Sequence, residues 1–402
     1  MDKRNFMKVL QINSICGIRS TGRICTDLAE MLNGNGHACK LAYGREPVPG
    51  EHRKHAVRIG SNRDVYRHAA ESLLFDSAGF GSRAATYGFI DWIERYNPDI
   101  IHLHSIHGYY INMEVLFEYL ANANRKVVWT QHDCWAFTGH CPYFTAAHCE
   151  RWKTGCHDCP QQTKYPMSYV LDRSKRNWNR KRELFTSVRN MTIVTPSKWL
   201  AGLAGESFLG KYPIRVIRNG VDTGIFKPDP GDFRERYSLE GKRMILGVAS
   251  VWEERKGLKD FVRLSEMLDE ESRIVIAGLS KRQMAGLPKE IIRIGRTDDP
   301  RELARLYSAA DVFLNLTYED NYPTTNLEAQ ACGTPVITYQ SGGSSETLHN
   351  GDAYFVDAGD IRGVYKALAG IKNGHRDPLE SGCKAALDKS RMMEEYMKVY
   401  LG

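Results

Sequence analysis

The sequence lacks the marks of a membrane-spanning, secreted or disordered chain. No apolar run approaches the roughly 18 consecutive residues of a membrane span. Met1–Phe6 is charged and no long apolar segment follows it, so no signal peptide is predicted. No long low-complexity segment and no repeat of solenoid length is present. These absences exclude an integral membrane protein and a largely disordered one, and favour a globular protein of the cytoplasm.

The length and charge predict two domains and an anionic partner. A chain of 402 residues exceeds a usual domain, so two domains are expected. The net charge is +7, and residues 1–200 carry the excess, with 27 basic and 18 acidic residues. Such a surface suits a membrane, a phospholipid-linked substrate or nucleic acid. A solvated basic surface without a partner is an equal alternative.

Short apolar runs alternate with helical patterns along the chain. This alternation predicts two doubly wound α/β domains with parallel sheets, a first domain over 1–225 and a second over 226–385. The stretch Lys227–Asp232, rich in proline, glycine and aspartate, is suited to a linker between them. The predicted strands are 7–12, 38–43, 99–104, 126–130, 192–195 and 215–217, then 244–249, 273–277, 291–294, 311–315 and 335–338.

The strongest motif runs from Asp320 to Val336. A strand leads into a loop, and a helix begins near Thr324, so backbone N–H groups of Thr325 and Asn326 are suited to bind a phosphate. Glu328 lies one turn into that helix, within reach of the hydroxyls of a ribose attached to the phosphate. Asp320, eight residues earlier, can face the other side of the ligand.

This motif resembles the E-x7-E segment of retaining, GT-B-fold glycosyltransferases of family 4. Asp320 stands where glutamate is usual, and the resemblance implies that it contacts the donor sugar. Lys256, before Gly257, matches the lysine that holds the donor diphosphate in the family. The usual arginine nearby is missing, and Arg255 is its candidate substitute. With these cations, no metal ion is expected in the chemistry.

Two further segments support the resemblance. The run Arg218–Pro228 is similar to the N-G-V-D hinge segment of the family, and the helix within 386–402 matches the last helix, which crosses back to the first domain. Gly22 corresponds to the glycine-rich loop near the donor phosphates. His132, with Asp133 beside it, is the best candidate for a residue of the cleft between the domains that touches the donor sugar or the acceptor, and His104 is the second.

Five cysteines fall within residues 134–159. Cys141, Cys149, Cys156 and Cys159 have the number and type of ligands for a tetrahedral zinc ion that would order the loop 134–160. Buried free thiols and a redox pair at Cys156 and Cys159 are the alternatives. This segment resembles that of glycosyltransferases that make colanic acid and related exopolysaccharides. The basic stretch 172–182 could lie on anionic lipid headgroups or form a solvated face.

The resemblance implies transfer of a sugar, with retained configuration, from a GDP- or UDP-sugar to a glycan. The acceptor would be a hydroxyl of a lipid-linked oligosaccharide or other glycan in surface polysaccharide biosynthesis. The enzyme would lie in the cytoplasm, with peripheral contact to the inner face of the membrane. A nucleotide-sugar 2-epimerase on the same fold is one alternative. A zinc-stabilised nucleic-acid-binding protein is the other, and Asp320 and Glu328 count against it, because a nucleic-acid site has no need of them.

Overall fold

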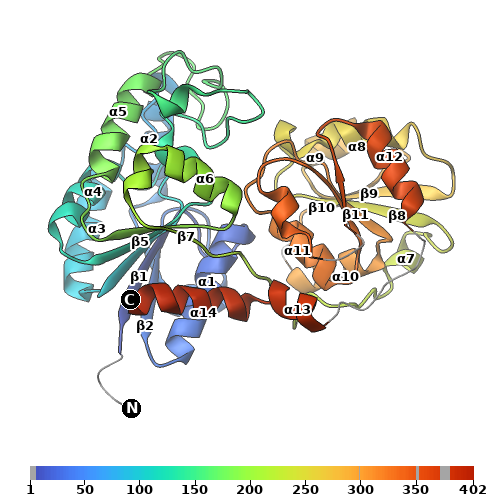
Figure 1. The fold of residues 1–402 in the computed structure, drawn as a ribbon, viewed down its shortest axis with the longest axis horizontal. Helices are drawn as coiled ribbons and strands as arrows, with labels where there is room; N and C mark the ends of the chain where they lie inside the picture. The colour runs from blue at the N-terminus through green and yellow to red at the C-terminus, as the bar shows by residue number, and fades with distance from the viewer. Residues whose placement is uncertain (1–5, 298, 350–352, 372–380) are drawn as a thin grey trace. The chain divides into compact units, whose positions relative to one another are not determined.

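The computed structural model describes residues 6–297, 299–349, 353–371 and 381–402 (Figure 1). The chain divides into two compact units: unit 1 is Met1–Ile217 with Glu395–Gly402, and unit 2 is Arg218–Glu394. The sequence placed the corresponding boundaries at residues 225 and 385. Residues 1–5, on which the signal-peptide prediction partly rests, lie outside the described residues.

The described part of unit 1 contains a parallel sheet of seven strands. Their order is β3-β2-β1-β4-β5-β6-β7, so the order reverses between β1 and β4. The strands are β1 (Lys8–Asn13), β2 (Ala38–Tyr43), β3 (Ala56–Arg58), β4 (Ile100–Leu103), β5 (Lys126–Thr130), β6 (Met191–Thr195) and β7 (Ile214–Val216).

Helices connect these strands. They are α1 (Arg19–Gly34), α2 (Asn62–Phe75), α3 (Arg83–Tyr96), α4 (Met113–Asn122), α5 (Ser174–Phe185) and α6 (Lys198–Glu206), with short 3-10 turns at η2 (Gly50–His55), η3 (Trp135–Phe137), η4 (Arg151–Lys153) and η5 (Phe208–Lys211). Strand reversal beside β1 sends the crossover helices to opposite faces of the sheet. The unit is therefore doubly wound, as predicted.

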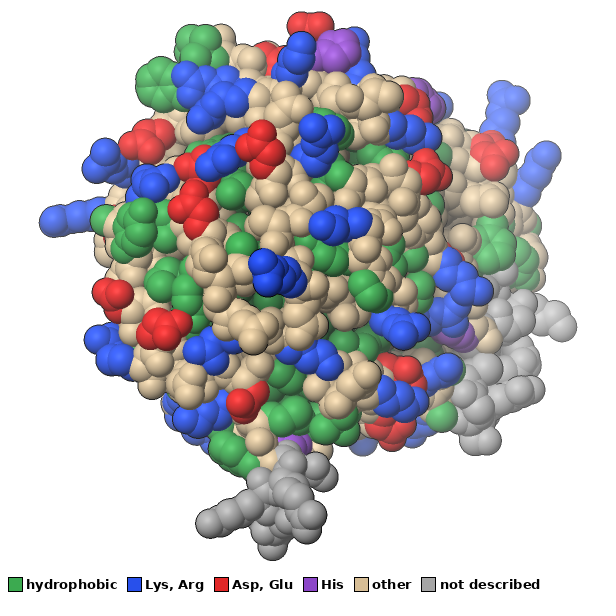
Figure 2. All heavy atoms as spheres, turned by 60° about the vertical axis from the view of Figure 1, so that its left-hand side comes forward, with side chains coloured by type: hydrophobic (Ala, Val, Ile, Leu, Met, Phe, Trp, Pro, Cys, Tyr) green, Lys and Arg blue, Asp and Glu red, His purple; other side chains and the backbone are tan. Residues whose placement is uncertain are grey.

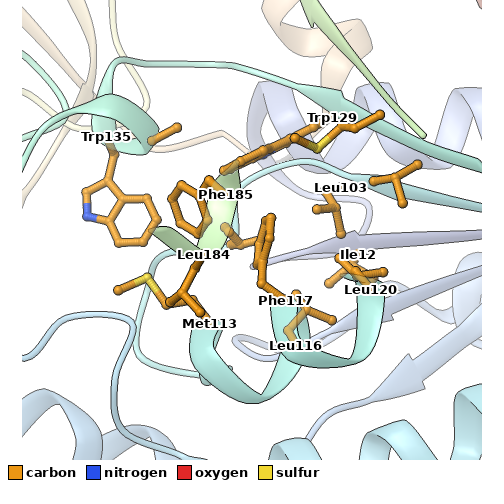
Figure 3. Close-up of a cluster of buried hydrophobic side chains, with 14 of the residues drawn as sticks. Ile12, Leu103, Met113, Leu116, Phe117, Leu120, Trp129, Trp135, Leu184 and Phe185 are labelled. Carbon is orange, nitrogen blue, oxygen red and sulfur yellow. The ribbon is translucent and has the colours of Figure 1, made fainter. Parts of the chain in front are cut away.

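An aromatic cluster forms the centre of the core of unit 1 (Figure 3). Phe117 of α4 and Phe185 of α5 lie 4.4 Å apart between ring centroids, and Trp129 of β5 meets Phe185 edge-on at 4.8 Å. Such pairs add stability beyond the apolar area that they bury. Trp135 of η3 joins the same cluster, which ties the start of the cysteine-rich loop to the core.

Unit 2 repeats the same topology with a parallel sheet of six strands in its described part. Their order is β10-β9-β8-β11-β12-β13, with the reversal between β8 and β11. The strands are β8 (Arg243–Val248), β9 (Ser272–Leu279), β10 (Ile292–Gly295), β11 (Val312–Asn315), β12 (Val336–Tyr339) and β13 (Ala353–Val356). The fold class predicted for the second domain is confirmed.

The helices of unit 2 follow the same βα alternation. They are α7 (Phe233–Arg236), α8 (Leu258–Ser265), α9 (Lys281–Gly286), α10 (Pro300–Ala309), α11 (Thr324–Ala331), α12 (Ile361–Gly370) and α13 (Ser381–Leu387), with 3-10 turns at η6 (Glu254–Lys256) and η7 (Ser344–Thr347). The last helix, α14 (Lys389–Leu401), begins in unit 2 and ends in unit 1.

The end of α14 is anchored in unit 1 by buried hydroxyl groups. Tyr400 OH lies 2.7 Å from His102 Nδ1, and Tyr396 OH lies 2.9 Å from Thr130 Oγ1. Lys126 Nζ also donates to the Tyr400 carbonyl at 3.2 Å. The last turns of the chain are therefore part of the fold of unit 1.

The surface carries both signs of charge. Figure 2 shows lysine and arginine side chains spread over one face among acidic and hydrophobic ones. None of the helices in the described parts of the chain is long and apolar enough to span a bilayer.

Candidate active site

The candidate donor site lies where the strand order of unit 2 reverses, which is where open α/β sheets bind ligands. The loop 249–257 follows β8, and the loop 316–323 follows β11. The backbone N–H of Tyr318 donates to the Arg255 carbonyl at 2.8 Å and joins the two loops. The topology thereby brings together the two motifs that the sequence assigned to the donor.

Lys256 and Asp320 form an ion pair, with 2.5 Å between Nζ and Oδ2 and with side chains only 21% and 15% exposed. Burial raises the pKa of Asp320, but the cations of Lys256 and Arg255 outweigh it and hold this pKa below its usual range. Burial lowers the pKa of Lys256, against the attraction of Asp320. Two opposite charges are thus held together where the sequence placed the diphosphate and the donor sugar.

Gly257 explains why Lys256 lies so close to the end of β11. Its φ is +71°, and a Cβ at this position would lie 2.1 Å from the Leu316 carbonyl oxygen. Only glycine fits such a conformation and such an approach. In the Lys-Gly pair of the motif, the backbone conformation therefore requires the glycine, and the lysine supplies the charge.

Arg255 points toward Asp320 and not to open solvent. Its Nη1 lies 3.9 Å from Asp320 Oδ2 and donates to the Glu319 carbonyl at 2.9 Å. Its Nε donates to Glu253 Oε2 at 2.9 Å. The guanidinium is thus held beside the Lys256–Asp320 pair, as a substitute for the missing arginine would have to be.

Glu328 is buried in α11, with 3% of the residue exposed. Its Oε2 accepts a hydrogen bond from the hydroxyl of Tyr307, on α10, at 3.0 Å. This partner was missed in the sequence, because Tyr307 lies in a different helix and in no motif. The hydroxyl fixes the carboxylate in one orientation.

Thr325 and Asn326, the two predicted phosphate-binding residues in the first turn of α11, have different surroundings. The N–H of Asn326 donates to the Pro323 carbonyl at 3.2 Å. Its buried side chain bonds Asn315 Nδ2 and Thr347 Oγ1, each at 2.8 Å. Asn326 thus has a structural task, while Thr325 is half-buried at the start of the helix.

Gly22 lies in the first turns of α1, beside the loop that follows β1. A Cβ at Gly22 would lie 3.2 Å from the Gly17 nitrogen and 3.3 Å from Ile15 Cγ1. The N–H of Gly17 donates to the Gly22 carbonyl at 3.2 Å. Glycine thus lets the loop after β1 close tightly on the helix.

His132 and Asp133 follow β5 but make different contacts. His132 is half-buried, and its Nε2 lies 3.1 Å from Nδ1 of the buried His104. Asp133 pairs with His107, with 2.9 Å between Oδ2 and Nε2, and accepts the Trp135 N–H at 2.9 Å. Asp133 thus shapes the loop, and His104 contacts His132 from the interior.

The four candidate zinc ligands line one small pocket in the cysteine-rich loop. Cys141, Cys149, Cys156 and Cys159 border it together with His140 and Trp152. Cys156 Sγ accepts the Gly139 N–H at 3.1 Å. In the described part of the chain, no group of three or more histidine, cysteine or acidic side chains is placed so that it could hold a metal ion. The zinc site therefore stays a prediction.

The basic stretch 172–182 contains one fully buried lysine. Lys181 Nζ donates to the carbonyls of Trp135 and Thr138 at 2.7 and 3.0 Å, and lies 3.3 Å from the centroid of the Trp135 ring. Trp178 and Phe185 lie on the same buried face of α5, at the helical spacings of three and four residues. That spacing is the sequence signal that could have identified Lys181 as an inward residue.

Family models match both halves of the chain. A model described as Glycosyltransferase Family 4 matches residues 21–224, just over half of the chain. A second, described as Glycosyl transferases group 1, matches residues 231–380. The family resemblance stated from the motifs is confirmed.

Two curated relatives illustrate the similarity. The colanic acid biosynthesis glycosyl transferase WcaC of Escherichia coli K12 is 26% identical, over 98% of this chain and 99% of that protein. The alpha-galactosylglucosyldiacylglycerol synthase of Streptococcus pneumoniae R6 is 32% identical, over 46% of this chain and 50% of that protein.

Solved structures show the same fold over nearly the whole chain. Sucrose-phosphate synthase of Thermosynechococcus elongatus matches 98% of each chain with a TM-score of 0.71 and 16% identity. Anabaena Alr3699/HepE, solved with UDP-glucose, matches 98% of this chain and 99% of its own with a TM-score of 0.65 and 14% identity. The two doubly wound units are thus those of the GT-B fold.

Proposed function

Because the chain belongs to glycosyltransferase family 4, we propose that it moves a sugar from a UDP- or GDP-sugar to a hydroxyl of a glycan acceptor. The observation that carries the proposal is the paired Lys256 and Asp320 at the strand reversal of unit 2, with Glu328 in the helix that follows. Full-length similarity to WcaC supports a role in polysaccharide biosynthesis. The proposal includes a lipid-linked oligosaccharide or other glycan as the acceptor.

Charge is the main contribution of unit 2 to this chemistry. The bond between the sugar and the diphosphate breaks as negative charge grows on the leaving phosphate, and fixed cations stabilise that charge. Lys256 and Arg255 are such cations. When the diphosphate binds, Lys256 would pair with it instead of with Asp320. The Asp320 carboxylate would then accept a hydrogen bond from a hydroxyl of the sugar. Because the chain supplies the cations, the proposal includes no metal ion in the reaction.

Glu328 and the start of α11 would hold the nucleotide. A buried carboxylate accepts hydrogen bonds from a vicinal ribose diol, and Tyr307 already fixes one of its oxygens. The N-terminal end of α11 is favourable for the distal phosphate, with Thr325 as the backbone donor. In unit 1, the proposal assigns Gly22 to the donor phosphates and His132 to the donor sugar or the acceptor. The proposal includes retention of the anomeric configuration, as in the family, and no nucleophile is assigned.

The test is nucleotide release from a panel of UDP- and GDP-sugars, with and without an extract of lipid-linked acceptors. We expect release from one donor that acceptor accelerates, and that Glu328→Gln abolishes. Glu290→Gln, at an exposed position of the same unit, is the matched control and should retain full activity.

Three results would contradict the proposal. Conversion of the sugar without an acceptor would indicate an epimerase. Salt-sensitive binding of nucleic acid without turnover of any donor would indicate a different use of the fold. Release that Glu328→Gln does not change would mean that the nucleotide site is assigned wrongly.

A structural zinc ion in the cysteine-rich loop is part of the proposal. Four thiols border one pocket, and four thiolates are a usual ligand set for structural zinc. The loop 131–173 contains only two 3-10 turns as regular structure, although Trp135, Phe137 and Trp152 are buried in the core of unit 1, so a metal would add to the order that this packing supplies. Zinc binding would require the thiols to turn toward one point, since they are not so placed in the structure.

Peripheral contact with an anionic membrane, at the inner face of the cytoplasmic membrane, is also proposed. Tyr169 and Val170 are 63% and 61% exposed, and Leu74 and Phe75 are 49% and 43% exposed. Tyr169 N–H donates to the Leu73 carbonyl at 2.8 Å, which brings the two segments together. We call Leu74, Phe75, Tyr169 and Val170 the apolar patch. The Arg173 guanidinium lies 5.6 Å from the centroid of the Phe75 ring, so basic charge adjoins it.

A further inference from the structure

A continuous chain of hydrogen bonds runs through the interior of unit 1 to His132. Gln11 lies on β1, His104 directly after β4, and His132 two residues after the end of β5. Gln11 Oε1 lies 3.1 Å from His104 Nε2, and His104 Nδ1 lies 3.1 Å from His132 Nε2. The rings of His104 and His132 are nearly parallel, with 14° between their planes. Gln11 and His104 are 0% and 2% exposed, so water does not compete for the hydrogen bond between them.

The orientation of the Gln11 amide sets the direction of this chain. Gln11 Nε2 lies 2.9 Å from the carbonyl oxygen of Cys25 and 3.4 Å from Cys39 Sγ. A carbonyl oxygen only accepts, so the amide nitrogen must face Cys25. The amide oxygen then faces His104. A flipped amide would place two acceptors against each other in a buried site, at a large cost in free energy.

The orientation of Gln11 determines which nitrogen of each ring carries the proton. An amide oxygen accepts, so Nε2 of His104 must be protonated and donate to it. Burial lowers the pKa of His104 well below its usual range, and the rings of His102 and His132 add to this effect. The neutral ring has one proton, so Nδ1 of His104 is an acceptor. Nε2 of His132 must therefore carry the proton of the next hydrogen bond.

Other titratable groups around these rings leave this assignment intact. His102 lies 4.0 Å from His104 between ring centroids, but its nitrogens face the hydroxyls of Tyr400 and Thr130 at 2.7 and 2.8 Å. The Asp133 carboxylate is directed to His107 at 2.9 Å. Burial lowers the pKa of His132 to about 4, with Asp133 opposing the shift. His132 is therefore neutral near pH 7, and its Nδ1 holds a lone pair.

We propose that Gln11 and His104 are positioning residues that fix His132 as the Nε2–H tautomer, so that Nδ1 can only accept a hydrogen bond. The consequence is specificity: Nδ1 of His132 accepts a hydrogen bond from a hydroxyl group, whereas it repels the oxygens of a phosphate or a carboxylate. His132 would thus recognise a neutral sugar hydroxyl of the donor or acceptor. This consequence rests on the proposed function; the tautomer itself does not.

The tautomer can be measured directly in the full-length protein. Two-bond proton–nitrogen correlation spectra of protein labelled with nitrogen-15 at histidine distinguish protonated from unprotonated ring nitrogens. We expect His132 to show a protonated Nε2 and an unprotonated Nδ1 at pH 7. In His104→Leu the two tautomers should mix. A protonated Nδ1 in the unaltered protein, or an unchanged spectrum in His104→Leu, would overturn the proposal.

Kinetics provide the second arm of the test. The amide of His104→Asn can place its oxygen near the position of Nδ1 and accept from His132, whereas His104→Leu cannot. We expect His104→Leu to lower kcat roughly tenfold, the value of one hydrogen bond, with little change in the KM of the donor. His104→Asn should restore most of the loss. His102→Asn, which changes the neighbouring ring outside the chain of bonds, is the control for a buried substitution.

The two arms separate this proposal from the proposed function. If no nucleotide-sugar is turned over but the His132 tautomer is as expected, the proposed function fails and the positioning holds. If turnover is found but His104→Asn is as impaired as His104→Leu with an intact fold, the positioning fails alone.

Discussion

At the scale of single residues, Asp320 is the departure from the family pattern that the structure explains best. Its carboxylate lies 2.5 Å from Lys256, and the backbone of Gly343 donates to the Asp320 carbonyl at 3.1 Å. Gly342 cannot carry a Cβ, because that atom would lie 2.0 Å from the Asp320 carbonyl oxygen. The loop after β11 is thus held from both sides, and the shorter aspartate still reaches its cation.

Replacing Lys256 tests the charge argument most directly. We expect Lys256→Met to lower kcat for transfer by about 10²–10³, because a preorganised group that stabilises developing charge contributes about that much. The measurement is donor turnover at saturating acceptor. Lys259→Met, at an 89% exposed side chain three residues further on, should change turnover little. A loss below tenfold in Lys256→Met with an intact fold would contradict the diphosphate role.

Lys181 should make the stability of the protein depend on pH. Burial lowers the pKa of Lys181 to about 7, against the partial opposition of Cys156 and Asp76, whereas an unfolded lysine has a pKa of about 10.4. Between these values the unfolded chain binds a proton that the folded chain does not. The free energy of unfolding therefore rises as the pH increases through this window, by at most about 1.4 kcal/mol per pH unit.

The check is the difference in Tm between pH 7 and pH 9. The Tm should be higher at pH 9 than at pH 7, and this difference should shrink in Lys181→Met. Lys175→Met, at an exposed position of the same helix, should keep the difference. An equal pH dependence in Lys181→Met and the unaltered protein would show that Lys181 is not the titrating group.

At the scale of elements, the sequence predicted the central strands well and missed two edge strands. The predicted ranges 38–43 and 126–130 coincide with β2 and β5. The last four residues of β5 are continuously buried, and β2 buries Cys39, Leu41 and Ala42, so both strands have an apolar pattern that the sequence shows. β3 has only three residues, all half-buried, and Phe355 of β13 is 51% exposed. Edge strands are paired on one side only, so they need no apolar run that a sequence could reveal.

The residues of the candidate site that lie in motifs could be predicted from the sequence, and their partners from other elements could not. Asp320, Glu328 and Lys256 lie in contiguous motifs, and their loops follow neighbouring strands. Tyr307 and Gln11 act from other elements, and their roles depend on which strands and helices become neighbours. Such contacts are set by the tertiary structure, so local spacing carries no signal for them.

The cysteine-rich loop provides a prediction at this scale. We expect about one zinc ion per chain in metal analysis of the purified protein, and expect Cys141→Ser to lose it and lower the Tm. Cys332→Ala, at a buried cysteine of unit 2, should keep the metal. A metal-free protein whose four loop thiols all react with a thiol reagent would support free thiols and rule out the zinc hypothesis. A mass loss of two hydrogen atoms that a reductant reverses would indicate a disulfide instead.

At the scale of the whole molecule, charge and apolar exposure coincide in unit 1. Residues 151–200 contain 11 basic and 3 acidic residues, and this segment includes two members of the apolar patch, Tyr169 and Val170. Lys181 is buried and contributes no surface charge, but Arg173, Lys175 and Arg176 lie three to six residues after Val170 in the sequence. Basic side chains beside exposed apolar ones are typical of surfaces that bind anionic lipid.

This coincidence predicts binding to vesicles that contain an anionic phospholipid, measured by co-sedimentation. Binding should weaken as salt is raised, since each basic residue near the surface contributes about 1 kcal/mol of attraction that salt screens. Tyr169→Asp should reduce binding several-fold, because it removes an apolar contact and adds a repelled charge. Tyr365→Asp, at a 43% exposed tyrosine of unit 2, is the matched control. Equal binding by both variants would place the lipid contact elsewhere. Equal binding to neutral vesicles would show that apolar insertion, and not charge, causes the binding.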